Sequence, residues 1–102
     1  MASGYKILPR AGGDLRWVKS YYDMGNQGGG AKALFRMHDV FLLLSERPQI
    51  GPLAGQAPRR WFSVPGMPFT VVYQLRQDVL EIVRILDQRS GKYLSNLYGH
   101  LE

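Results

Sequence analysis

The segment FTVVYQLRQDVLEIVRIL, residues 69–86, decides the fold of this 102-residue chain. In its first half, Phe69 to Leu75, Phe, Val, Tyr and Leu fall on one face and Thr, Val and Gln on the other, the period of a strand with one buried and one wetter face. Its second half, Val79 to Leu86, is apolar on both faces apart from two opposed charges, which predicts a central strand. Residues 76–78 form the turn, so the segment predicts two antiparallel strands.

Runs on the N-terminal side extend this sheet. Arg59 to Val64 (RRWFSV) is strand-like and is followed by a Pro65-Gly66 turn, so it predicts a third antiparallel strand. Tyr5 to Pro9 (YKILP) is short, apolar and ended by proline, which suits an edge strand. The sequence therefore predicts four strands.

Two amphipathic stretches lie between the first strand and the later three. Asp14 is a suitable N-cap, and apolar residues recur at helical spacing from Leu15 until Gly25, which predicts one helix. A second helical stripe starts at Ala31 and stops at Pro48. The intervening GNQGGG is interpreted as a flexible connector, so the two helices are expected to form an antiparallel hairpin.

The expected fold class is α+β, in the order β-α-α-β-β-β, with the helix hairpin packed on a mainly antiparallel four-stranded sheet. Pro48 to Pro58 is rich in proline and glycine and is expected to be a surface loop, because too little chain lies on either side for two cores. We therefore expect one domain over residues 1–102. Residues 90–102 form a tail whose apolar residues favour a short amphipathic helix.

Charge and composition narrow the classes of function. Thirteen Lys and Arg against eight Asp and Glu give a formal charge of +5, which favours an acidic partner, with plain solubility as the alternative. The chain has no cysteine, which excludes disulfides, thiolate metal sites and thiol nucleophiles. No apolar run approaches the roughly 20 residues of a membrane span, and the N-terminus lacks the apolar core of a secretory signal. The cytoplasm is the expected location, with no membrane partner.

Motifs for catalysis and cofactor binding are weak. The glycines before Lys32 are followed by alanine rather than the Ser or Thr of a phosphate-binding loop. His38 and His100 are far apart without a nearby carboxylate cluster, so neither a metal site nor a general base is expected, and His38 is interpreted as a helix residue at the edge of the core. We expect no cofactor, no metal and no small-molecule substrate.

Basic and aromatic residues on the predicted sheet form the most informative candidate surface. Arg59, Trp61 and Ser63 share one face of their strand, and further cations follow from the neighbouring strand and its exit. Arginine forks beside an aromatic plate suit phosphate oxygens, base stacking or an acidic protein groove, whereas the alternative is a solvated face. The candidate target-binding residues are Arg59, Arg60, Trp61, Arg84, Arg89 and Lys92.

The first predicted helix carries more aromatic residues than one inward stripe can hold. Trp17, Tyr21 and Tyr22 cannot all point into the core. At least one of them is expected in a surface groove that a partner segment covers, although aromatic residues in a helix are more often core residues.

Taken together, these elements resemble the ParE/RelE superfamily of bacterial toxin–antitoxin systems. The resemblance runs from Tyr5 to about Arg89 and rests on the order and spacing of several pieces. These are YKILPRAGGDL (Tyr5 to Leu15), LLLSERPQIG (Leu42 to Gly51), the Arg59-Arg60 pair, PFTVVYQL (Pro68 to Leu75) and VLEIVRILDQRS (Val79 to Ser90). The resemblance implies a toxin neutralised by a small acidic antitoxin, ParD-like or similar, that lies across the helix hairpin and the sheet. The candidate antitoxin contacts are Trp17, Tyr21, Tyr22 and Phe41.

The superfamily has two main branches with different implied activities. The RelE-like branch cuts messenger RNA on the ribosome with basic residues and a C-terminal tyrosine, roles that Arg89 and Tyr93 could imitate here. One basic position of that branch is Thr70 in this chain, so a charge-assisted donor to the scissile phosphate is missing. Thr70 resembles the ParE branch more closely, which is implied to poison DNA gyrase and block replication. However, Asp87-Gln88-Arg89-Ser90 stands where ParE-like chains often have a histidine and paired arginines.

The favoured hypothesis is a ParE-like toxin that causes growth arrest by binding DNA gyrase, as a binding inhibitor rather than an enzyme. A RelE-like ribosome-dependent endoribonuclease is the alternative. A plain binding module with neither activity is the third hypothesis.

Overall fold

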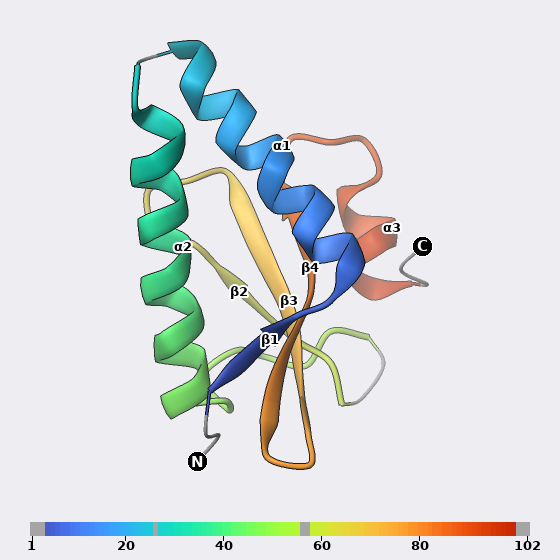
Figure 1. The fold of residues 1–102 in the computed structure, drawn as a ribbon. Coiled ribbons are helices and arrows are strands. Elements are labelled where there is room, and N and C mark those ends of the chain that lie inside the picture. Colours follow the sequence, from blue (N-terminus) through green and yellow to red (C-terminus); the bar gives the residue numbers. More distant parts are fainter. Residues whose placement is uncertain (1–3, 26, 56–57, 100–102) are drawn as a thin grey trace.

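Two long helices lie against one face of a twisted four-stranded sheet, and a short third helix packs on the other face (Figure 1). The computed structural model describes residues 4–25, 27–55 and 58–99. Along the chain the elements are β1 (Tyr5–Ile7), α1 (Pro9–Gly25), α2 (Gly29–Glu46), β2 (Arg60–Ser63), β3 (Phe69–Arg76), β4 (Val79–Asp87) and α3 (Tyr93–Tyr98). The predicted order β-α-α-β-β-β is confirmed, and the tail adds α3.

The sheet has the strand order β1-β4-β3-β2. β4 pairs with β1 in parallel and with β3 antiparallel, and β2 pairs antiparallel with β3, so β4 is a central strand as its two apolar faces predicted. Gln77 and Asp78 make the β3–β4 turn with positive φ angles, as the twist of a tight hairpin requires. A register shift between Val72 and Tyr73 leaves Val83 without an opposite residue and marks a bulge in β4.

The main core lies between the sheet and the helix hairpin. Phe69, Val71 and Tyr73 alternate toward the helices and are almost fully buried. Met37 and Phe41 of α2 meet them in the same cluster. Each such side chain contributes about 1.5–3 kcal/mol on burial, so this contact fixes the hairpin on the sheet.

The opposite face of the sheet is covered at its centre, where the expectation of an open basic surface is wrong. Val72 and Leu86 point to this face, and Leu97 of α3 packs against them with Ala54 from the loop before β2. Trp61 is partly buried in the same cluster. The correction has a simple cause: β4 is apolar on both faces, and the C-terminal tail folds back to cover the second one.

The first helix begins earlier than the sequence predicted. α1 starts at Pro9, whose fixed φ suits the first helical position, and the amide of Gly12 already donates to the carbonyl of Leu8 at 3.0 Å. Asp14 therefore lies inside the helix, and its assignment as an N-cap is wrong. Its carboxylate instead bonds β4, as described below.

The glycine run is not the flexible connector that we expected. α2 begins at Gly29 after Gly28 in the left-handed conformation, and residue 26 of the predicted connector lies outside the described residues. Gly30 is buried where the helices cross, since a Cβ there would lie 2.5 Å from the carbonyl oxygen of Lys19. Asp23 of α1 accepts from the Gly30 amide at 2.7 Å and from Lys19 Nζ at 2.8 Å. These two hydrogen bonds lower the pKa of the Asp23 carboxyl, and the one from Lys19 has the larger effect.

Candidate protein-binding surfaces

Arg84 does not project from an open sheet face. Its guanidinium donates to Asp14 of α1, from Nε at 2.8 Å and from Nη2 at 3.3 Å, and the amide of Ile85 donates to the same carboxylate at 2.8 Å. Both charged side chains are mostly buried, with 14% and 18% exposed. Asp14 therefore ties α1 to the bulged part of β4, and Arg84 belongs to the fold more than to a docking surface.

The three aromatic residues of α1 gather around one buried ring. Phe69 of β3 lies at the centre, and the rings of Trp17, Tyr21 and Tyr22 approach it with centroids 5.8–6.2 Å away. Trp17 and Tyr21 are stacked nearly parallel, 5.5 Å apart at 12°. Trp17 is 50% exposed, while Tyr21 and Tyr22 are half-buried. The three rings therefore do not all point into the core, as expected from the sequence.

Arg89 packs against this aromatic group. Its guanidinium lies 4.6 Å from the centroid of the Tyr21 ring, and Nη1 donates to the Tyr21 hydroxyl at 2.7 Å. Asp87 accepts from Nε at 2.9 Å and from Nη2 at 3.0 Å, and from the Arg89 amide at 2.9 Å. The side-chain hydrogen bonds from Arg89 hold the pKa of Asp87 below its ordinary range. In turn, the hydrogen bond of Arg89 to Asp87, and to a smaller extent the one to Tyr21, raises the pKa of Arg89.

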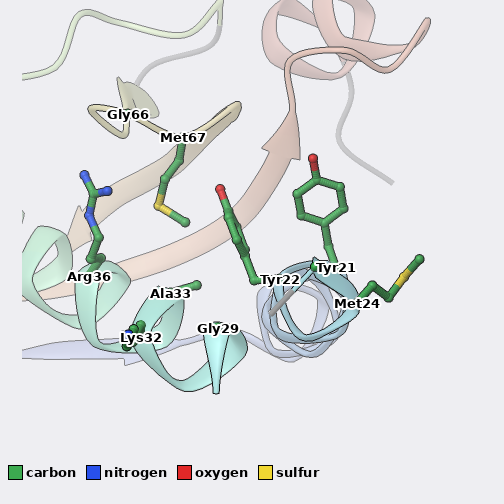
Figure 2. Close-up of a pocket in the computed structure, with 10 residues that line it drawn as sticks. Tyr21, Tyr22, Met24, Gly29, Lys32, Ala33, Arg36, Gly66 and Met67 are labelled. Carbon is green, nitrogen blue, oxygen red and sulfur yellow. The ribbon is translucent and has the colours of Figure 1, made fainter. Parts of the chain in front are cut away.

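A groove of about 590 Å³ begins beside these rings (Figure 2). It lies between the end of α1, the start of α2 and the β2–β3 turn. Its lining residues are Tyr21, Tyr22, Met24, Gly25, Gly29, Lys32, Ala33, Arg36, Gly66 and Met67. Figure 2 shows Tyr22 standing toward Met67, across from Arg36 on α2.

The groove combines an apolar floor with cations on one side. Lys32 and Arg36 are four residues apart on α2, so they share a face of the helix. Arg36 donates to the carbonyl of Pro65 and so ties the β2–β3 turn to α2. Burial raises the pKa of Tyr22, and Coulomb repulsion from Tyr21 adds to it. Met24 at the rim is 87% exposed. Such a groove suits an amphipathic segment with acidic residues on one side.

The predicted target-binding residues fall into separate groups. Trp61 lies on the face of β2 that α3 borders and is half-buried. Arg59 lies directly before β2 and is also half-buried. Lys92 is exposed directly before α3. Arg60 turns the other way and donates to the carbonyl of Gly51 at 2.7 Å. The structure therefore places Trp61 on the face that α3 borders and Lys92 at the start of α3, while Arg60, Arg84 and Arg89 each hold a different part of the fold.

Arg89 and Tyr93, the pair that could imitate a nuclease, are not brought together. Arg89 lies over Tyr21 on the helix face of the sheet. The Tyr93 hydroxyl bonds that of Thr70, 2.8 Å away, on the other face. Thr70 is fully buried and also accepts from Gln88 at 3.0 Å. The polar ends of the pair thus point to opposite faces.

Phe41 does not lie where an antitoxin contact would need it. Its side chain is 2% exposed and packs in the main core, with Tyr5 edge-on at 5.2 Å. Apolar residues at helical spacing can be either core or contact residues, and Phe41 is a core residue. The hydroxyl of Tyr5 hydrogen-bonds His38, which sits at the surface of α2 beside the core. His100 lies outside the described residues.

Sequence reasoning missed several residues of these surfaces. Asp14 and Asp87 were read as a cap and as part of a divergent motif, and Lys32 as part of a rejected phosphate loop. Their roles depend on partners distant in the chain. Across residues 4–25, 27–55 and 58–99, no three His, Asp or Glu side chains are grouped as metal ligands would be, and no helix in those ranges is long and apolar enough to cross a bilayer.

A helix hairpin on a mixed sheet, with aromatic and basic surfaces around it, defines a small α+β domain with candidate protein-binding surfaces. The chain belongs to the family described as "ParE toxin of type II toxin-antitoxin system, parDE", whose model matches residues 5–90. The predicted membership of the ParE/RelE superfamily, in its ParE-like branch, is thereby confirmed.

A solved structure supports the fold independently. A chain of the chromosomal ParDE TA system from P. aeruginosa superposes with a TM-score of 0.56 at 21% sequence identity, over 80% of this chain and 91% of that one. At this identity the likeness shows the fold alone. Among curated protein sequences, none matches this chain.

Proposed function

We propose that this ParE-family toxin arrests growth by binding DNA gyrase, and that a ParD-like acidic antitoxin neutralises it. The observation that carries a binding mechanism is the environment of Thr70. This residue stands where the RelE-like branch has a basic residue, and it is buried and bonded to Tyr93 and Gln88. A cation that would stabilise charge on a scissile phosphate is absent at that position.

The groove beside the α1 aromatic residues supports the antitoxin half of the proposal. Its floor of Tyr22, Ala33 and Met67 offers apolar area, and Lys32 and Arg36 flank it with positive charge. An acidic amphipathic segment would bury its apolar side on this floor and place carboxylates beside the cations. The formal charge of +5 would steer such a partner toward the toxin.

The face that carries Arg59, Trp61 and Lys92 is the proposed contact for gyrase. Trp61 is half-buried beside α3, so it offers a rigid aromatic edge, and the cations of the proposed contact are Arg59, directly before β2, and Lys92, directly before α3. Aromatic and arginine side chains dominate the energetics of protein interfaces. This face lies across the sheet from the antitoxin groove.

The test is direct binding of the purified toxin to purified gyrase, measured with an immobilised toxin. Arg59→Glu is expected to weaken gyrase binding about tenfold, because it reverses a charge at the proposed contact, and to change antitoxin affinity less than threefold. Lys6→Glu in β1, at the other edge of the sheet, is the matched charge reversal and should leave both affinities within about twofold. Absence of any gyrase binding would remove the proposal, and equal loss of both partners would remove the assignment of this face.

A further inference from the structure

Trp17, Tyr21 and Arg89 form a stack with the elements of a nucleic-acid site. Two rings are nearly parallel with centroids 5.5 Å apart, and the guanidinium lies over the second ring, 4.6 Å from its centroid. Aromatic plates and arginine planes of this kind bind unpaired bases, and an arginine fork binds phosphate. The stack is accessible, with Trp17 50% exposed and the Arg89 side chain 48% exposed. In a chain of charge +5, such a stack would favour RNA or single-stranded DNA.

Asp87 changes the chemistry of this stack. It occupies the edge of Arg89 formed by Nε and Nη2, at 2.9 and 3.0 Å, which is an edge that would grip a phosphate. A third donor, Nη1, is taken by the Tyr21 hydroxyl. The positive charge is therefore balanced within contact distance, while the flat apolar surfaces of Trp17 and Tyr21 remain. What is left suits a protein side chain better than a polyanion.

We propose that Asp87 is a specificity-determining residue, which by filling the Arg89 fork closes the Trp17–Tyr21–Arg89 stack to nucleic acid. The inference rests on the proposed function insofar as it assumes protein partners for this surface. Its test uses neither gyrase nor antitoxin, so the two proposals fail separately.

The experiment measures the affinity of the purified toxin for a fluorescein-labelled 20-residue oligodeoxythymidine by fluorescence anisotropy at several salt concentrations. Asp87→Asn keeps the shape and the acceptor for the Arg89 amide but removes the charge. We expect it to bind the oligonucleotide about tenfold more tightly than the wild type at low salt. The slope of log K against log salt should steepen by about 0.7, the value for one added phosphate contact to a single strand.

Two further variants make the result specific. Asp78→Asn in the exposed β3–β4 turn adds the same unit of charge at the opposite end of β4, and asparagine tolerates the positive φ there. It should improve binding no more than about twofold, from net charge alone. Asp87→Asn combined with Arg89→Gln should return to the wild-type affinity, because the fork is then absent.

Equal gains for Asp87→Asn and Asp78→Asn would overturn the inference, as would a gain that survives the loss of Arg89. Near-ultraviolet circular dichroism checks that each variant is folded. Should Asp87→Asn not fold, Asp87→Ser keeps a short acceptor for the Arg89 amide and carries the same expectation.

Discussion

At the scale of single residues, Asp14 shows how one carboxylate joins elements that are 70 positions apart in the chain. Its side chain accepts from Arg84 and from the amide of Ile85, in the part of β4 that lies beyond its pairing with β1. Of the buried side-chain nitrogen and oxygen atoms in the described ranges, none lacks a partner. Removing Asp14 would therefore take an acceptor away from buried donors, which costs free energy of folding.

We predict that Asp14→Ala lowers the free energy of unfolding by about 2–3 kcal/mol, since it removes the carboxylate that accepts from a mostly buried guanidinium and from the Ile85 amide. Asp39→Ala on the exposed surface of α2 is the control and should stay within about 0.5 kcal/mol. Urea unfolding followed by circular dichroism measures both. A loss for Asp14→Ala as small as that of the control would show that the bridge adds nothing.

Asp87 gives a pH dependence whose sign follows from its lowered pKa. A carboxyl with a lowered folded-state pKa stabilises fully above its unfolded value, about 4, and this contribution is lost as the pH falls through the lower folded-state value. The partner Arg89 is half exposed, so solvent limits the effect to about 0.5 kcal/mol. The stability difference between wild type and Asp87→Asn should be constant from about pH 5 to 7 and shrink below about pH 4. A difference unchanged at pH 2 would contradict this cause.

At the scale of elements, the strands were predictable because their side chains alternate and their turns are marked. β3 and β4 begin and end within about one residue of their predicted bounds. The start of α1 was not, because Pro9 was read as the end of a strand when it is the first residue of a helix. Local sequence supports both readings, and the pairing of Leu8 with Ile82 decides between them.

The glycines before α2 illustrate the same limit. A glycine run favours flexibility in isolation, but Gly30 is required by the close approach of α1, which only the assembled hairpin reveals. The residues of the candidate site also fall into those that the sequence predicts and those that it does not. Trp17, Tyr21 and Tyr22 were predictable from an excess of aromatic residues on one helix, whereas the Asp87–Arg89 pair and the groove depend on three elements meeting.

We predict that Gly30→Ala destabilises the protein by about 1–3 kcal/mol, although alanine normally improves a helix by about 1 kcal/mol. Its Cβ would lie 2.5 Å from the backbone oxygen of Lys19, so the helices must separate. Gly12→Ala in α1 is the control, because its Cβ would meet nothing closer than an Arg16 nitrogen at 4.0 Å. Thermal unfolding should show a lower Tm for the first and an equal or higher Tm for the second. Equal effects would mean that the crossing is not tight.

At the scale of the whole molecule, the sheet separates two surfaces. The aromatic rings of α1 and the groove lie on the helix side, while Trp61 lies on the side that α3 borders, with Lys92 directly before α3. Because the two surfaces are separate, a substitution on one of them can lower the affinity for one proposed partner without affecting the other. It also explains why Arg84→Glu is a poor probe of binding, because the change would place a second carboxylate beside Asp14.

Lys32→Glu is predicted to reduce antitoxin affinity about tenfold and to leave gyrase affinity within about twofold, since Lys32 lines the groove and lies away from β2. Lys6→Glu again provides the matched charge reversal, with both affinities expected to stay near those of the wild type. Titration calorimetry with the purified antitoxin measures the loss. Unchanged antitoxin affinity would place the antitoxin elsewhere on the toxin.

The proposed function requires that this ParE-family chain inhibits DNA gyrase by binding it. The most direct measurement is gyrase-catalysed supercoiling of relaxed plasmid at rising concentrations of the purified toxin. A parallel reaction with translating ribosomes measures whether the toxin cuts a reporter messenger RNA. We expect dose-dependent loss of supercoiling, reversed by the antitoxin, and intact messenger RNA. Undiminished supercoiling together with cuts in the ribosomal A site would contradict it.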